Sequence, residues 1–160
     1  MGKSEAKTNA IRMLQQKKIS FSVHSYDASG GAVDGKTVAS MTGFSPSRVF
    51  KTLVTEGASR MNYVFVVPVT GELDLKKAAR AVGEKSIAML PQSRLLPLTG
   101  YVHGGCSPVG MKKLFPTVLD SSASQVETLL VSAGRIGLQM ELTPADLLAV
   151  TGGTMAEVAL

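Results

Sequence analysis

The chain has 160 residues, of which 44% are hydrophobic and 18% are charged, so it can bury a core and is not a disordered protein. Its net charge is +5, and 12 of its 17 Lys and Arg residues lie in residues 1–80, which favours a basic face and a polyanionic partner. A single cysteine excludes a disulfide framework and is typical of a reducing compartment. With no membrane-length apolar run and no signal-peptide pattern, we expect a cytoplasmic protein without a membrane partner.

The first half of the chain shows the periodicities of both helices and strands. An amphipathic helix is expected over residues 4–18, and an alternating strand over Phe21–Tyr26. A short helix is expected over residues 36–42. Two strands, Val49–Thr55 and Asn62–Val69, follow and are joined by a polar turn.

The second half continues the mixture without an internal repeat. Asp74 is expected to cap a helix over Leu75–Val82, because Asp is favoured at N-caps and Gly83 can end the helix. The other expected elements are a strand over Ser86–Met89, a helical turn over Pro91–Leu96, a structured loop over residues 100–110, strands over Thr117–Asp120, Val126–Ser132 and Gly137–Leu142, and a helix from Pro144 to Val150. Strands in adjacent runs with interspersed helices predict an α+β (mixed α/β) fold, in a single domain over residues 1–160.

Conventional catalytic and metal-binding side chains are few. His24, His103 and Cys106 do not make the four-ligand pattern of a structural zinc site, so we expect no metal. A nucleophile pair of Cys106 and His103 is conceivable, because a thiol needs a nearby base. The alternative is that Cys106 is a small loop residue.

The segment Gly30–Thr37 matches the phosphate-binding pattern GxxxxGK[ST] letter for letter. In such loops, backbone N–H groups surround the phosphates and the lysine neutralises them. The preceding segment FSVHSYD alternates, however, whereas a buried parallel strand is nearly continuously apolar. Asp34 would also place a carboxylate among the phosphates. The alternatives are therefore a phosphate-binding protein and a flexible connection that happens to match.

Two further features are chemically unusual. Lys51 stands within the apolar strand VFKTLV, on the same face as Val49 and Leu53, where a lysine is costly unless it reaches solvent or meets an anion. It either faces a phosphate or carboxylate in a cleft, or protects the edge of a sheet. Gly104 and Gly105, in GGCSP, either let backbone N–H groups stabilise a developing oxyanion or form a tight turn that requires glycine.

These segments carry a family resemblance. VFKTLV, LDLKKAARAVG, TGYVHGGCSPVGMKK and VETLLVSAGRIGLQMELTPADLL follow one another in the order found in the YbaK/prolyl-tRNA synthetase-associated editing domain family, which the chain resembles from about Lys7 to Val158. Members of that family are aminoacyl-tRNA deacylases that clear mischarged tRNA, typically tRNA(Pro) carrying cysteine or alanine. The resemblance implies a free-standing, trans-acting deacylase. Its substrate would be the 3′ end of aminoacyl-tRNA, with no cofactor and with prolyl-tRNA synthetase as a candidate partner.

The resemblance also implies roles for particular residues. Lys51 is expected to engage the 3′-terminal adenosine and its phosphate, and the backbone of Gly104, with Gly105 beside it, to face the scissile ester carbonyl. The expected substrate-binding residues are Tyr26, Thr52, Ser107, Pro108, Ser132, Gly134 and Arg135. Because no protein nucleophile is apparent, hydrolysis is expected to be substrate-assisted. Either a ribose hydroxyl helps a water molecule attack, or the thiol of a cysteinyl substrate attacks its own ester.

Two departures from the family pattern concern amino-acid specificity. Gln139 stands where relatives can carry an aspartate, and Ala28–Lys36 lacks the acidic character of free-standing members. Small substitutions in the pocket can shift the preferred amino acid, because a pocket discriminates a single methylene by only about 1–3 kcal/mol.

The expected architecture is a mixed, partly barrel-like β-sheet flanked by helices. Five basic residues are candidates for a surface that faces tRNA: Lys76, Lys77, Arg80, Lys112 and Lys113. The alternative is that they only form the solvated faces of a helix and a turn. The alternative function is a non-catalytic module that binds tRNA ends or a synthetase.

Overall fold

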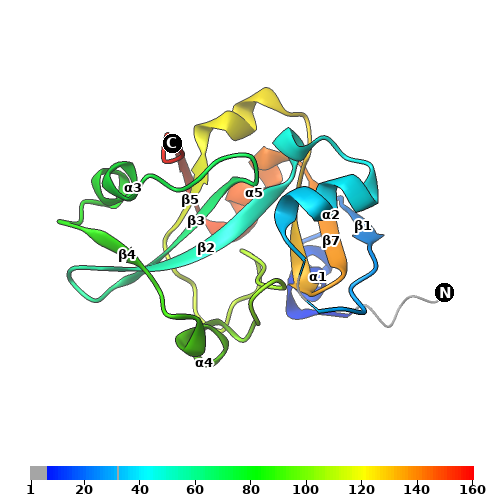
Figure 1. Cartoon of the computed structure of the whole chain (residues 1–160), viewed down its shortest axis with the longest axis horizontal. Coiled ribbons are helices and arrows are strands. Elements are labelled where there is room, and N and C mark those ends of the chain that lie inside the picture. Colours follow the sequence, from blue (N-terminus) through cyan, green and yellow to red (C-terminus); the bar gives the residue numbers. More distant parts are fainter. Residues whose placement is uncertain (1–6, 32) are drawn as a thin grey trace.

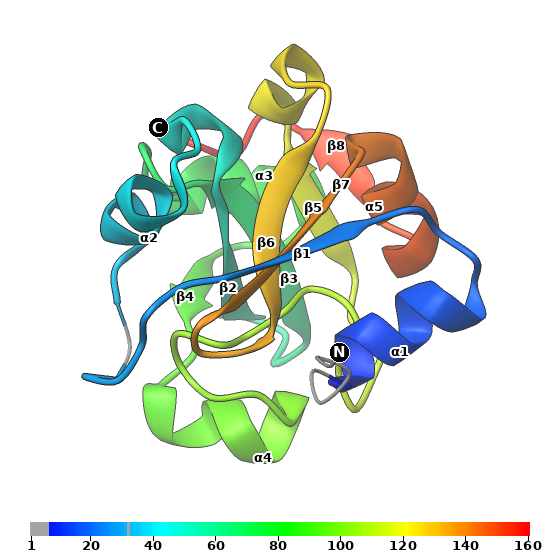
Figure 2. The same ribbon diagram turned by 90° about the vertical axis from the view of Figure 1, so that its right-hand side faces the viewer.

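Two β-sheets organise the residues described by the computed structural model, 7–31 and 33–160 (Figure 1). The smaller sheet is antiparallel with strand order β1-β7-β6, and the larger is mixed with order β4-β2-β3-β5-β8. Figure 2 shows the smaller sheet crossing in front of the larger one. The strands are β1 (Ser22–Ser25), β2 (Phe50–Gly57), β3 (Asn62–Pro68), β4 (Ile87–Met89), β5 (Thr117–Asp120), β6 (Leu129–Arg135), β7 (Leu138–Leu142) and β8 (Thr154–Ala156).

Helices surround the two sheets and have well-defined ends. The side chains of Thr8, Asp34, Asp74 and Thr143 accept hydrogen bonds from first-turn N–H groups, as N-caps do. No helix within the described residues is long and apolar enough to cross a membrane. The α-helices are α1 (Asn9–Gln16), α2 (Gly35–Thr42), α3 (Leu75–Val82), α4 (Leu95–Thr99) and α5 (Pro144–Thr151), and the 3₁₀ helices are η2 (Pro46–Arg48), η3 (Gln92–Arg94) and η4 (Ser121–Gln125).

The main core fills the space between the sheets. Alternation along β2 and β3 sends one set of side chains toward the smaller sheet and the other toward α3. The inner set includes Phe50, Val54, Val64 and Val66, which share a cluster with Leu129, Val131, Met140 and Leu142 of β6 and β7. On the opposite face, Phe65 and Val67 pack with Ala78 of α3. The central sheet is therefore buried on both faces.

β2 is paired unevenly on its two sides. β3 pairs with it from Phe50 to Glu56, whereas β4 pairs only with Thr55–Gly57. An isolated parallel bridge between Val49 and Leu130 connects the start of β2 to β6. Between these two contacts, residues 51–53 have no strand partner on that side within the described part of the chain. A cavity of about 670 Å³ lies at this interruption.

The predicted α+β fold is confirmed. The bridge between Val49 and Leu130 joins the sheets along one side, and the described strands do not close into a complete barrel. The first helix is shorter than expected. It ends at Gln16 because Lys18 takes a left-handed conformation with φ of 57°, and residues 4–6 of the expected helix lie outside the described residues.

Other element boundaries also differ from the predictions. The turn expected over Pro91–Leu96 continues through α4 to Thr99, and β6 lies three residues later than the expected strand. β8 was not predicted, because it has three residues and its first two are exposed, so it shows no apolar alternation.

A buried carboxylate ties β8 and the C-terminal segment to the sheet. Asp120 is 4% exposed and accepts hydrogen bonds from the N–H groups of Val158 and Ala159, both at 2.9 Å, and from Ser122. Burial by itself raises the pKa of Asp120, but these hydrogen bonds outweigh burial and hold the pKa below its ordinary value. The ionised form therefore stabilises the fold.

We expect Asp120→Asn to lower the free energy of unfolding by about 1–3 kcal/mol, because N–H donors lose their charged acceptor. In the wild type, the Asp120 contribution is present above the unfolded pKa of about 3.9 and is lost as pH falls through the lower folded pKa. Urea denaturation at pH 7 and at lower pH measures both effects. The exposed Glu127→Gln, with the same change in charge, is the control; an equal loss of stability in both variants would contradict this role.

Candidate active site

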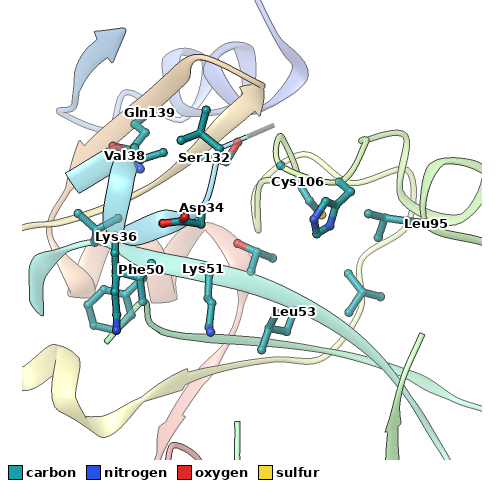
Figure 3. A pocket seen from close by; sticks show the side chains of 18 of the residues that line it. Asp34, Lys36, Val38, Phe50, Lys51, Leu53, Leu95, Cys106, Ser132 and Gln139 are labelled. Atoms are coloured by element: carbon teal, nitrogen blue, oxygen red, sulfur yellow. The ribbon is translucent and has the colours of Figure 1, made fainter. Parts of the chain in front are cut away.

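A cavity of about 670 Å³ opens beside the start of β2. Residues of α2, β2, β4, α4, β6, β7 and the loop after α4 line it. Because β2 has no strand partner here, the cavity reaches side chains on both of its faces. Figure 3 shows Asp34 and Lys36 on one side of this cavity, and Cys106 and Leu95 on the other. Of the site residues expected from the sequence, Tyr26, Lys51, Thr52, Gly104 and Ser132 line the cavity.

Lys51 lies on the face of β2 that also carries Leu53, as the alternation predicts. Its side chain is 31% exposed, and Nζ lies 3.6 Å from Oε2 of Glu72, which lines the same cavity. The aliphatic part of the lysine is thus partly covered by protein while its ammonium group reaches the opening. This position is suited to binding an anionic group that enters the cavity.

Two buried polar atoms in the cavity wall have no hydrogen-bond partner among the described residues: Oγ1 of Thr52 and Oε1 of Gln139. Gln139 is only 6% exposed and pairs with Ser132 in the β6–β7 ladder, so that these two polar side chains are neighbours. Buried polar groups in proteins are nearly always hydrogen-bonded. Two such atoms in one cavity wall make it suited to a polar group, whether water or a ligand, that supplies the missing partners.

The glycine loop packs against the turn between β6 and β7. Gly104 has φ of 88°, a conformation that side chains rarely adopt. A Cβ on Gly105 would lie 2.8 Å from the backbone N of Ile136 and 3.0 Å from the carbonyl carbon of Arg135, so glycine is required for this contact. The N–H of Gly105 donates to the carbonyl oxygen of Val102 at 3.0 Å. Gly105 therefore supports the loop, and its N–H is already used within the protein.

Five of the expected site residues lie outside the cavity lining. Gly105, Gly134 and Arg135 belong to the contact between the loop and the end of β6, where Gly105 packs on Arg135 and Gly134 packs on Tyr101. Ser107 is fully buried, and its hydroxyl accepts a hydrogen bond from the N–H of Val109. Pro108 lines a second cavity of about 250 Å³ behind the loop. The structure thus places these five in or beside the glycine loop and not in the wall of the cavity.

Cys106 and His103 both line the cavity, but the cysteine is not poised as a nucleophile. Cys106 is 8% exposed, and burial raises the pKa of its thiol to about 12. The reactive thiolate is therefore nearly absent at neutral pH. Within the described residues, no group of three or more His, Cys, Asp or Glu side chains is arranged to hold a metal ion.

Comparison with known proteins identifies the family. Residues 31–150 match the model of the aminoacyl-tRNA editing domain. The chain belongs to this family. It is 44% identical over 156 residues, 98% of this chain and 95% of the relative, to a protein of Enterococcus faecalis named "Putative Cys-tRNA(Pro)/Cys-tRNA(Cys) deacylase EbsC". It is also 29% identical over 125 residues, 78% of each chain, to the uncharacterized YwhH of Bacillus subtilis.

Solved structures share the fold of this editing domain. One, described as "a putative trans-editing enzyme for prolyl tRNA synthetase", has a TM-score of 0.84 at 28% identity, covering 96% of this chain and 98% of that chain. Another, the hypothetical protein APE2540, has a TM-score of 0.86 at 20% identity, covering 96% and 100%, and shows the shared fold alone. The family predicted from the sequence is confirmed, and with it the prediction of an aminoacyl-tRNA deacylase.

The structure does not support a phosphate-binding loop at Gly30–Thr37. β1 pairs antiparallel with β7, its one strand partner among the described residues, whereas the strand before a phosphate-binding loop belongs to a parallel sheet. Oδ1 of Asp34 accepts a hydrogen bond of 2.8 Å from the N–H of Thr37, so the protein's own carboxylate occupies the start of α2. Lys36 nevertheless lines the large cavity together with Lys51.

Asp34, Lys36 and Glu72 are charged cavity residues that the sequence did not indicate for the editing site. Ala39 of α2 packs against Val49 and Val69, which holds the helix over the start of β2. The signal for Lys36 was the Gly-Lys pair itself, which singled out a lysine suited to phosphate but suggested another fold around it. Glu72 had no comparable signal in the sequence.

We expect Cys106→Ala to retain deacylase activity within a fewfold of the wild type, because the buried thiol is protonated at neutral pH. Steady-state kinetics on a mischarged tRNA test this. A folded Cys106→Ala enzyme without activity would restore the thiol as the nucleophile.

We expect Gly105→Ala to lower kcat/KM by about 10²-fold, because a Cβ at this position displaces the loop that carries Gly104, and small misplacements are costly in active sites. Gly30→Ala is the matched control, since a Cβ there has no neighbour within 4 Å. Both variants are compared by kinetics and by thermal unfolding. Full activity in Gly105→Ala would contradict this prediction, because it would show that catalysis tolerates displacement of the loop by the added Cβ.

Proposed function

We propose that this editing domain is a free-standing enzyme that hydrolyses the ester of Cys-tRNA, with Cys-tRNA(Pro) as its first candidate substrate. The observation that carries the proposal is that Lys51 and Gly104, from distant parts of the sequence, line one cavity whose wall holds unpartnered polar atoms. The name of the Enterococcus faecalis relative supports cysteine as the amino acid. We propose a single domain over residues 1–160 that acts in the cytoplasm, where charged tRNA is used.

In this proposal, Lys51 and Gly104 act on different parts of the substrate. The ammonium group of Lys51 binds the phosphate of the 3′-terminal nucleotide as a point charge. The backbone N–H of Gly104 donates to the ester carbonyl oxygen as it becomes negative in the transition state. Because the N–H of Gly105 is bonded to Val102, Gly104 is the member of the pair that serves as donor. Gly104 adopts a positive φ of 88°, a backbone conformation that side-chain-bearing residues rarely adopt.

The nucleophile comes from the substrate or from water. Cys106 is protonated, as its raised pKa requires. The sulfur of a cysteinyl group can instead attack its own ester carbonyl carbon, so that the ribose oxygen leaves and takes up a proton. Water then opens the resulting cyclic thioester to free cysteine. For other amino acids, a terminal ribose hydroxyl would direct a water molecule to the same carbonyl.

Amino-acid selection is assigned to the polar part of the cavity wall. Oε1 of Gln139 lacks a donor, and a substrate ammonium or thiol can supply one. Gln139 is neutral, whereas an aspartate there would attract an ammonium group by charge as well. With a neutral acceptor, discrimination between substrate amino acids depends more on the size of their side chains. Size alone discriminates small groups by only about 1–3 kcal/mol.

Five basic residues expected from the sequence to face tRNA lie away from the cavity. Lys77 of α3 is bound to Glu157 at 2.7 Å, and Nζ of Lys112 donates to the carbonyl oxygen of Pro97 at 3.4 Å. Lys76, Lys77, Arg80, Lys112 and Lys113 all lie outside the lining of the large cavity. We propose that they contribute general attraction for tRNA, and that prolyl-tRNA synthetase is a partner for tRNA selection.

We expect Lys51→Ala to lower kcat/KM on Cys-tRNA(Pro) by about 10- to 100-fold, the loss of one hydrogen bond to a charged group. Lys51→Arg keeps the charge and is expected to lose less. Release of cysteine from charged tRNA measures both variants. Undiminished hydrolysis by Lys51→Ala would remove Lys51 from the site. Salt-dependent tRNA binding by a wild type without turnover would establish the non-catalytic module instead.

A further inference from the structure

The charges in the large cavity cancel, although the ligand proposed for it is an anion. Among the described residues, the Asp, Glu, Lys and Arg side chains that line it are Asp34, Lys36, Lys51 and Glu72. Two carboxylates facing two ammonium groups give no net attraction for phosphate. The two carboxylates, Asp34 and Glu72, differ, however, in their hydrogen-bond and ion-pair partners.

Asp34 has a structural partner and is fixed. Its carboxylate caps α2 through the N–H of Thr37, and this hydrogen bond lowers the pKa of Asp34. It therefore remains ionised and in place whether or not a ligand is present. Its role as the N-cap of α2 therefore accounts for the presence of Asp34 in a cavity proposed to bind an anion.

Glu72 is placed differently. Its backbone is anchored, because its carbonyl oxygen accepts a hydrogen bond of 2.8 Å from the N–H of Leu160. Its side chain is 77% exposed, and within the described residues its one polar contact is Lys51, at 3.6 Å. A long, exposed ion pair of this kind contributes little to stability. It is, however, directed at the lysine that is proposed to bind the substrate.

We infer that Glu72 is an internal counter-ion that occupies Lys51 in the empty enzyme and is displaced by the 3′-terminal phosphate of aminoacyl-tRNA. The inference rests on the proposed function, because it takes Lys51 as the phosphate-binding group. The anchored backbone keeps the carboxylate within reach of Lys51, and the exposed side chain is free to turn into solvent when phosphate arrives.

The exchange makes Glu72 a residue that sets specificity. Every anion entering the cavity competes with the same carboxylate, so a ligand with one phosphate gains little at Lys51. The tRNA end brings several phosphates, and Lys36 lies in the same cavity to meet a second one. Figure 3 shows the side chains of Lys36 and Lys51 extending to the same side of the β2 ribbon. Glu72 thereby disfavours free nucleotides relative to tRNA.

The test is Glu72→Gln, which removes the charge and keeps the size. We expect KM for Cys-tRNA(Pro) and Kd for uncharged tRNA to fall about two- to fivefold, the range for an exposed ion pair, with kcat unchanged. The inhibition constant of AMP, used as the single-phosphate probe, is expected to fall by at least the same factor. Glu127→Gln is the control, because it makes the same charge change at an exposed carboxylate that does not line the cavity.

A double variant separates an effect of Glu72 that acts through Lys51 from a general effect of its negative charge on tRNA binding. In a Lys51→Ala background, Glu72→Gln should leave Kd for uncharged tRNA unchanged, because there is no lysine to release. Unchanged KM and Kd in Glu72→Gln, or equal decreases in Glu127→Gln or in the Lys51→Ala background, would overturn the inference. If Glu72→Gln unfolds at a lower temperature than the wild type, Glu72→Ala is measured in its place under the same criteria.

The failure of this inference is distinguishable from failure of the proposed function. A wild type that releases no amino acid, or a Lys51→Ala enzyme with full activity, overturns the proposed function. The counter-ion inference alone is overturned if the wild type is active, Lys51→Ala is impaired, and Glu72→Gln leaves KM and Kd unchanged.

Discussion

The uneven pairing of β2 is the constraint on which the site depends. A strand in the interior of a sheet normally has partners on both sides, because unpaired backbone groups are costly when buried. Here β4 pairs only with the end of β2, and the ladder to β6 is limited to the isolated bridge between Val49 and Leu130 within the described residues. The gap between them exposes the stretch that carries Lys51 and Thr52 to a cavity reached from both faces. The fold thus makes room for a ligand by omitting a strand contact within an otherwise well-packed core.

The second requirement is that the glycine loop stay in place opposite β2. The loop has no regular secondary structure, yet Gly105 is packed directly on the backbone of the β6–β7 turn. The phenol of Tyr101 also donates to the carbonyl oxygen of Val109 at 2.6 Å, which braces the loop from within. Residues that do not line the cavity therefore determine where Gly104 lies. Loops of this kind combine an irregular path with the rigidity that catalysis needs.

The sequence predicted more about the chemistry of the site than about its construction. Lys51 was identifiable because a lysine within VFKTLV conflicts with its apolar surroundings. Gln139 attracted notice only as a departure from the family, since a polar residue in a strand reveals neither its burial nor its lack of a partner. Gly105 could not be separated from Gly104 in the sequence, because the neighbour that excludes a side chain comes from a distant turn. Tertiary contacts of that kind leave no local pattern in the chain.

The anchoring of Glu72 by Leu160 has a consequence for how the molecule can be handled. The hydrogen bond between them, with the bridge between Leu73 and Ala159, brings the last described residues to the rim of the cavity. A peptide attached after Leu160 would leave the fold beside Glu72, which lines the cavity. An affinity tag or fusion partner attached there would share space with an incoming tRNA end.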